Sequence, residues 1–204
     1  MKDAIATISL ITPYCQSRYH GTPKKNKELA DGYERRTWKE RLHYDSETKE
    51  VFIPALALAN SLKEAAKFLS VQIPGKGKAT YTKHFEAGVS VLDDIPTGWT
   101  VDNVVSKEMF VPSDGKRGGG SRVMKVFPLL TPPLQFKATY QINDDLITAE
   151  VFAQHLAQAG NLIGIGAFRI RNNGVWGRYR VDSIDWIERA GEMKLPPINY
   201  LKAA

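Results

Sequence analysis

The chain has 204 residues, of which 43% are hydrophobic and 25% are charged, and this composition excludes an intrinsically disordered protein. Its 28 lysines and arginines outnumber its 22 acidic residues, so the net charge of +6 fits a polyanionic partner. A single cysteine, Cys15, excludes an intramolecular disulfide, and the four histidines are too scattered for a zinc motif. We therefore expect a cytoplasmic protein without metal or cofactor, and without an apolar run long enough to cross a membrane.

The chain begins with a strand and a long basic segment. Alternation in residues 4–11 puts Ala6, Ile8 and Leu10 on one face, which predicts a half-buried strand. Residues 16–44 are polar and basic and contain aromatic residues, a combination that can stack bases while it binds phosphates. A solvated loop balanced by nearby acidic residues is the alternative. The candidate RNA-binding residues of this segment are Arg18, Lys24, Lys25, Lys27, Arg35 and Arg36.

A short strand at residues 51–53 and Pro54 precede a predicted helix. Its buried stripe follows helical spacing and comprises Leu58, Leu62, Ala65, Ala66 and Leu69. Asn60 and Ser61 can offer small polar groups to a phosphate, and Lys63 adds a positive charge on the flank of the helix. The alternative is that Asn60 and Ser61 are ordinary surface residues. A further strand is expected at residues 88–92.

An insertion occupies residues 97–130. Two arms rich in β-forming residues, 99–111 and 122–130, flank the glycine-rich sequence PSDGKRGGGSR, which predicts a β-hairpin. An insertion of this shape is typical of a functional element or of a disordered segment. Its candidate RNA-binding residues are Lys116, Arg117, Arg122 and Lys125.

Residues 134–142 give the clearest strand pattern in the chain, with alternating apolar and polar side chains. Thr148 can cap a following helix that ends at Gly160. Its buried stripe comprises Phe152, His155, Leu156 and Ala159, so we interpret His155 as a core residue. A final strand runs through Val181.

The stretch IGIGAFRIRNNGVWGRYRV, residues 163–181, contains no acidic residue. Its glycines, including Gly164 and Gly166, allow positive φ or close approach of another backbone. Arg169 and Arg171 are two residues apart, so on a strand they share a face that suits a phosphodiester chain. The alternative is a β-hairpin that turns at Asn172-Asn173-Gly174 and exposes ordinary arginines. Gly164, Gly166, Arg169 and Arg171 complete the candidate RNA-binding set.

The order of elements predicts an α+β fold. Split β-α-β units of this kind close into a ferredoxin-like or RRM-like antiparallel sheet with helices on one face. The other face of the sheet is then free to meet RNA. We expect one domain over residues 1–204, with a basic loop insertion at 16–44 and a thumb-like β-hairpin insertion at about 97–130.

Two segments resemble the RAMP superfamily of CRISPR proteins. The segment DSETKEVFIP, followed by NSLKEAAK, is similar to the family's short strand, Ile-Pro and Ser-Leu-Lys helix start, although the residues ALALA separate the two here. The run with GIG, NNG and WGR is similar to the family's glycine-rich loop. The inserted hairpin lies where the Cas-seven backbone subunits carry a thumb.

The resemblance implies a Cas-seven-like backbone subunit that binds guide RNA and has no catalysis of its own. It also implies partners: guide RNA with its target strand, copies of the same chain in a filament, and other CRISPR effector subunits, with no membrane. One alternative is a RAMP-type endoribonuclease that uses His20 or His43 as general base, and another is target cleavage by Asp31. A third is a viral or plasmid-encoded mimic that inhibits or caps a CRISPR complex.

Overall fold

The computed structural model describes residues 1–113 and 120–189, which form an α+β fold with antiparallel sheets. Four strands build the main sheet in the order β4-β8-β1-β9. These strands are β1 (Lys2–Leu10), β4 (Val89–Val91), β8 (Gln135–Ile142) and β9 (Tyr179–Glu188). The predicted strands at residues 4–11, 88–92 and 134–142 are confirmed within one or two residues, because strict alternation specifies a half-buried strand.

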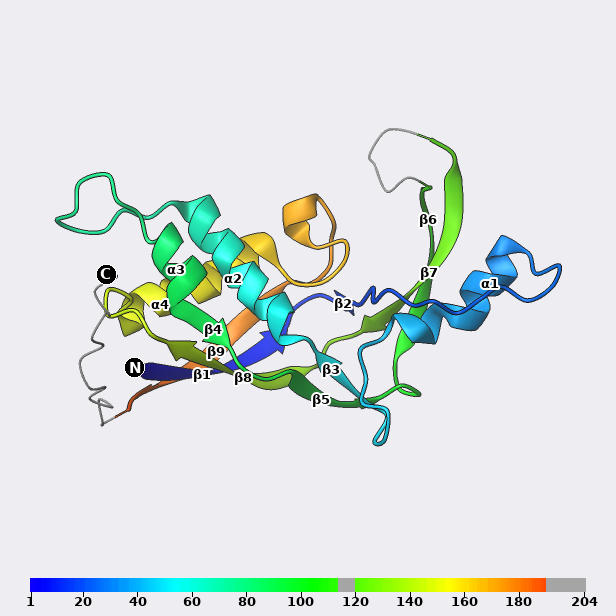
Figure 1. Ribbon diagram of the computed structural model, residues 1–204, viewed down its shortest axis with the longest axis horizontal. Coiled ribbons are helices and arrows are strands. Elements are labelled where there is room, and N and C mark those ends of the chain that lie inside the picture. The colour runs from blue at the N-terminus through cyan, green and yellow to red at the C-terminus, as the bar shows by residue number, and fades with distance from the viewer. Residues whose placement is uncertain (114–119, 190–204) are drawn as a thin grey trace, which may run out of the picture.

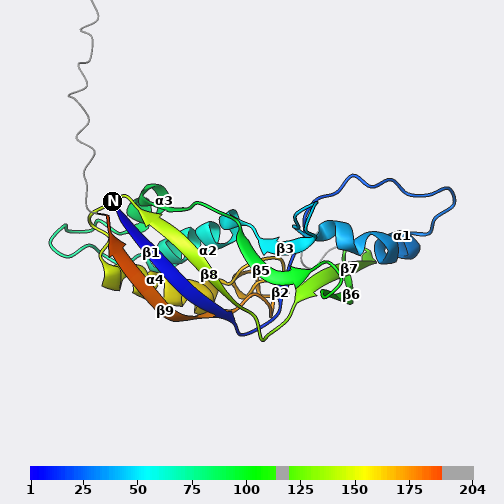
Figure 2. The same ribbon diagram turned by 90° about the horizontal axis from the view of Figure 1, so that it is seen from below.

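Helices cover one face of this sheet and leave the other open (Figures 1 and 2). They are α2 (Ala55–Leu69), α3 (Thr82–Gly88) and α4 (Ala149–Gln158), and α4 runs into a π-helical turn at Ala159–Ile163. Within the ranges 1–113 and 120–189, no helix combines the length and the apolar character needed to span a bilayer.

The core lies between the sheet and these helices. On β1 and β8, Ala6 faces Ala138 and Ile8 faces Phe136, and all four side chains are buried. The predicted stripe of α4 is confirmed, because Phe152 and Leu156 are fully buried and the Thr148 side chain caps the helix by accepting from Val151 N. His155 is also a core residue, as predicted: its ring packs 4.4 Å from the Phe85 ring.

The open face of the sheet carries polar side chains in which exposed cations such as Lys137 and Arg180 are mixed with carboxylates such as Asp182. Arg180 on β9 pairs with Asp182 (2.7 Å), which also accepts from Gln135 Nε2 (3.0 Å). Since the carboxylate already compensates this guanidinium, the open face is a weaker candidate for phosphate binding than the sequence suggested.

A second group of elements extends away from the main sheet (Figure 1). It contains β2 (Tyr14–Cys15), β6 (Val105–Pro112) and β7 (Arg122–Leu130) in the order β2-β7-β6, together with α1 (Ala30–Thr37) and a 3-10 turn at Trp38–Arg41. A small core of Cys15, Phe127 and Leu129 packs against Phe168 and Trp176 of the glycine-rich stretch. The hairpin is therefore tied to the main body through its base.

Three predictions about local structure are wrong or incomplete. The segment 16–44 is not only a loop, because α1 and the 3-10 turn form within it. The arm at residues 99–111 is broken: β5 (Ile95–Thr100) pairs with β3 (Glu50–Ile53), and β6 begins only at Val105. Helix α3 had no counterpart in the prediction, because its seven residues are too few for a periodic signal.

Candidate nucleic-acid interface

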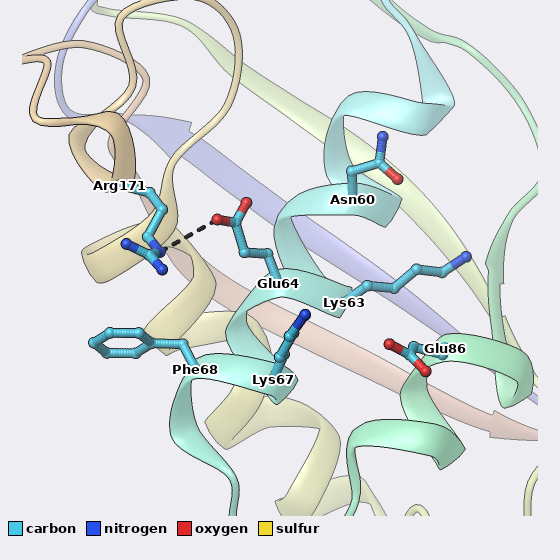
Figure 3. Close-up of a pocket in the computed structure, with 7 residues that line it drawn as sticks. All are labelled: Asn60, Lys63, Glu64, Lys67, Phe68, Glu86 and Arg171. Carbon is cyan, nitrogen blue, oxygen red and sulfur yellow. Dashed lines mark ion pairs between the residues drawn. The ribbon is translucent and has the colours of Figure 1, made fainter. Parts of the chain in front are cut away.

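An open groove of about 620 Å³ lies between α2, α3 and the glycine-rich loop, residues 164–178 (Figure 3). Side chains from successive turns of α2 line the groove, because residues three or four positions apart share one face of a helix. In α2 this face is opposite the buried stripe. Its lining residues are Asn60, Lys63, Glu64, Lys67, Phe68, Glu86 and Arg171. The groove thus brings together three of the predicted RNA-binding residues, Asn60, Lys63 and Arg171.

The glycine-rich loop is neither a pair of strands nor a hairpin, so both predictions for its local structure are wrong. It is a packed loop with one 3-10 turn at Ile170–Asn172. Gly164, Gly166 and Gly177 have φ of 74°, 80° and 76°, values that only glycine adopts without strain. Gly177 N donates to Pro13 O (2.7 Å), and Ile165 N donates to Gly177 O (2.9 Å).

The predicted need for close backbone approach is confirmed, although the backbone that approaches is the protein's own. A Cβ on Gly166 would lie 2.3 Å from Cys15 O, and one on Gly177 would lie 1.9 Å from Ile165 O. These glycines therefore set the course of the loop and thereby the position of its arginines.

Two loop arginines converge on one carboxylate of α2. Arg169 Nη2 lies 2.6 Å from Glu64 Oε2, and Arg171 Nε lies 3.2 Å from Glu64 Oε1 (Figure 3 shows the second pair). Two guanidinium groups share one carboxylate, so this cluster keeps a net positive charge. Arg171 is the more exposed of the two and lines the groove, whereas Arg169 lies further inside.

The prediction that Ser61 binds a phosphate is wrong. Its side chain is fully buried on the inner face of α2, and its Oγ lies 3.5 Å from Tyr179 Oη. Burial, partly offset by this contact, raises the pKa of Tyr179. Ser61 therefore has no exposed surface for a phosphate, and its neighbour Asn60 occupies the groove instead.

A second cluster of predicted residues lies between α1 and the hairpin β6–β7, in a cleft of about 430 Å³. Lys24, Arg122 and Lys125 line this cleft together with Tyr33 and Phe110. The Arg122 side chain is exposed, and Phe110 has 68% of its surface exposed. Cations beside exposed aromatic rings are suited to single-stranded nucleic acid.

Several cations of the second cluster already have carboxylate partners. Arg35 binds Glu108 (2.7 Å), Arg36 binds Glu28 (2.7 Å), and Lys125 binds the buried Glu34 (2.5 Å). Lys25 and Lys27 are exposed in the loop before α1, and Arg18 donates from Nε to Glu40 O (3.3 Å). Lys116 and Arg117 lie outside the described residues.

Glu34 anchors α1 to the hairpin. It accepts from Lys125 on β7 and from Arg41 Nη2 (2.9 Å). Removal from water opposes its ionisation, but the Lys125 hydrogen bond and the Arg41 charge outweigh this and hold the pKa of Glu34 below its usual value. The hairpin is therefore held by a buried ionic contact as well as by its apolar base.

The candidate catalytic residues of the alternative functions do not lie in the groove. The His20 ring stacks 6.1 Å from the Tyr33 ring, and the His43 ring packs against Phe52. Removal from water, with the Arg18 charge, lowers the pKa of His43. Asp31 lines the cleft beside the hairpin.

Sequence reasoning missed Glu64, Lys67, Phe68 and Glu86 as groove residues. The first three could have been found from helical spacing, because they follow Asn60 and Lys63 on the outer face of α2. Glu86 could not, since it depends on a helix that the sequence did not predict.

No protein-family model and no curated protein matches this chain. Among solved structures, one chain of the cryo-EM structure of the Type III-B Cmr-beta bound to cognate target RNA is similar, with a TM-score of 0.57 and 13% identity. The alignment covers 92% of this chain and 61% of that chain. The chain shares the fold of this Cmr-beta chain.

The RAMP fold was predicted from the Ile-Pro segment and the glycine-rich stretch, and the comparison confirms it at the level of architecture. The crystal structure of Cmr6 from Pyrococcus furiosus is also similar, with a TM-score of 0.47, 9% identity, and coverage of 89% of this chain and 99% of that chain. Our chain spans 61% of the length of the Cmr-beta chain that it matches.

Proposed function

We propose that the chain is a guide-RNA-binding backbone subunit of a CRISPR effector ribonucleoprotein. The observation that carries the proposal is the groove, in which the RAMP fold sets an arginine of the glycine-rich loop beside the lysines of α2. Lys63, Lys67 and Arg171 face one open, polar channel, as phosphate binding along a strand requires.

The finer fold assignment belongs to the same proposal. The elements β1, α2, β4, β8, α4 and β9 follow one another as β-α-β-β-α-β, and their sheet order supports a ferredoxin-like arrangement. The hairpin β6–β7 would then be the thumb. Its exposed Phe110 and Arg122 support contact with a neighbouring copy or its RNA in a filament.

The groove is tested by the double variant Arg169→Ala/Arg171→Ala. We expect single-stranded RNA to bind about tenfold more weakly, and the slope of log Kd against log salt to fall, because two positive charges are removed from the edge of the groove. Fluorescence anisotropy over a series of salt concentrations measures both quantities.

The matched control is Lys137→Ala/Arg180→Ala, which removes two exposed cations from the open face of the sheet. This control should lower the affinity much less. Unchanged affinity of the Arg169/Arg171 double variant at low salt would overturn the assignment of RNA binding to the groove.

The absence of catalysis is part of the proposal and has its own test. Purified protein is incubated with CRISPR repeat RNA as the wild type and as His20→Ala and His43→Ala. We expect intact RNA in every sample. Cleavage by the wild type that either substitution abolishes would replace the proposal with a RAMP-type endoribonuclease.

A productive subunit and a mimic differ in their neighbours. Co-expression with and without a CRISPR array, followed by native mass measurement and RNA sequencing, separates them. The proposal expects several copies of the chain on guide RNA together with other effector subunits. A single copy that caps an otherwise complete complex would instead identify a mimic, and a monomer free of nucleic acid would contradict both.

A further inference from the structure

Phe68 is an exposed aromatic side chain within a groove that is otherwise lined by polar and charged groups. It lies in the last turn of α2, with 53% of its surface exposed. The Arg171 guanidinium carbon lies 5.3 Å from the centre of its ring. A guanidinium group over a ring forms a planar stack whose outer face is a surface for a further flat group.

Glu64 holds this surface in place. It lies one helical turn before Phe68 and binds Arg171 Nε, so the guanidinium group is fixed above the ring from the same face of α2. The glycine-rich loop is held in the same place by a second contact, because Arg169 also binds Glu64. The surface is therefore formed before any ligand binds, which lowers the entropic cost of binding.

The charges around the groove indicate where phosphates would bind and where a nucleobase would bind. Lys63 and Lys67 lie along α2 and offer ammonium groups to phosphates, whereas Glu64 points to Arg171, and Glu86 extends from α3 on the side of the two lysines (Figure 3). At the Phe68 end of the groove the Arg171 guanidinium group is already paired with Glu64, so it has less charge to offer to a phosphate than the two lysines have. A nucleobase has a flat π-face and no charge, and it suits that end.

We propose that Phe68 and Arg171 form a stacking site for one unpaired nucleobase, with the adjoining phosphates on Lys63 and Lys67. The ligand class is single-stranded RNA, and the base identity matters little because every base has a π-face. This inference rests on the proposed RNA-binding function and adds to it a contact that carries no charge. The groove would then hold the RNA by stacking as well as by its phosphates.

The test is Phe68→Ala. Because a stacking contact releases no counterions, we expect about tenfold weaker binding of single-stranded RNA with an unchanged salt slope. Phe68→Tyr keeps an aromatic ring and should retain most of the affinity. Lys63→Ala/Lys67→Ala should instead reduce the salt slope. An RNA series that carries 2-aminopurine at successive positions should show quenching on binding to the wild type and less quenching with Phe68→Ala.

The matched control is Leu56→Ala, which removes an exposed apolar side chain (69% exposed) from the same helix outside the groove. Equal affinity of Phe68→Ala and Leu56→Ala, or a reduced salt slope with Phe68→Ala, would overturn the stacking site while RNA binding stands. Wild-type protein that binds no single-stranded RNA would overturn the proposed function itself. Unchanged denaturation midpoints in both variants establish that neither result comes from unfolding.

Discussion

Replacing Glu34 by alanine is expected to lower the free energy of unfolding by about 3–5 kcal/mol, because breaking a buried ion pair leaves charges without compensation. The Glu34 side chain is only 4% exposed and binds two cations, Lys125 from β7 and Arg41 from the 3-10 turn. Arg41 is itself largely buried and lies 5.6 Å from the Phe127 ring. Urea denaturation of the wild type and the variant measures the change.

The control is Glu108→Ala. Glu108 also joins α1 to the hairpin, through Arg35, but 49% of its side chain is exposed and water screens the pair. We expect little change in stability from this substitution. A loss with Glu34→Ala that is as small as the loss with Glu108→Ala would show that the buried contact does not hold the hairpin.

The same carboxylate makes stability depend on pH. The pKa of Glu34 in the folded chain is below its usual value, so its contribution is present above the usual pKa of about 4.3. It is lost as the pH falls through the lower folded value. The wild type should therefore lose more stability on acidification than Glu34→Ala does, and denaturation curves at neutral and acidic pH compare the two.

The main sheet and its helices could be predicted because their signals are local. Alternation along residues 134–142 specifies β8, and Thr148 with the stripe around Phe152 specifies α4. Pro54 marks the start of α2 in the same way. The alternation and the apolar stripes state which face of each element is buried, and one buried face per element is enough to define the layers of the fold.

The groove could be predicted only in part, because its geometry depends on contacts between distant residues. Nothing near Arg169 in the sequence indicates that it meets Glu64, more than one hundred positions earlier. Ser61 and Asn60 are neighbours in the chain, yet one is buried and the other lines the groove. Their positions around the helix axis decide which of the two is buried. An argument from residue type alone does not include these positions.

The glycine-rich stretch shows why composition alone was misleading. Its glycines and period-two arginines fit a strand pattern, but its conformation is set by the turn between β1 and β2 against which it packs. Gly177 N binds Pro13 O (2.7 Å), and Ala167 N binds Cys15 O (2.9 Å). The stretch is irregular because its backbone donors bind single acceptors in that turn, in β2 and within the loop itself, rather than the successive acceptors of one long neighbouring strand.

Replacing Gly177 by alanine is therefore expected to cost about 3 kcal/mol or more of unfolding free energy. Its φ of 76° is strained for alanine, and the added Cβ would lie 1.9 Å from Ile165 O, a backbone atom that cannot move alone. Ile165 is fully buried, so relief of the overlap requires the loop to shift relative to the core. Thermal and urea denaturation measure the loss.

Gly75→Ala is the control that separates the cost of a positive φ from the cost of the steric overlap. Gly75 has φ of 74°, and no atom lies within 4 Å of its added Cβ, so alanine there meets only the conformational cost of about 1–2 kcal/mol. The excess loss at Gly177 measures the packing of the loop. If the groove binds RNA, Gly177→Ala should also weaken RNA binding at temperatures where the chain remains folded, because the shift displaces Arg171 from Phe68. Equal losses of stability at the two glycines would mean that the loop adjusts freely, and its arginines would then not be held in place for RNA.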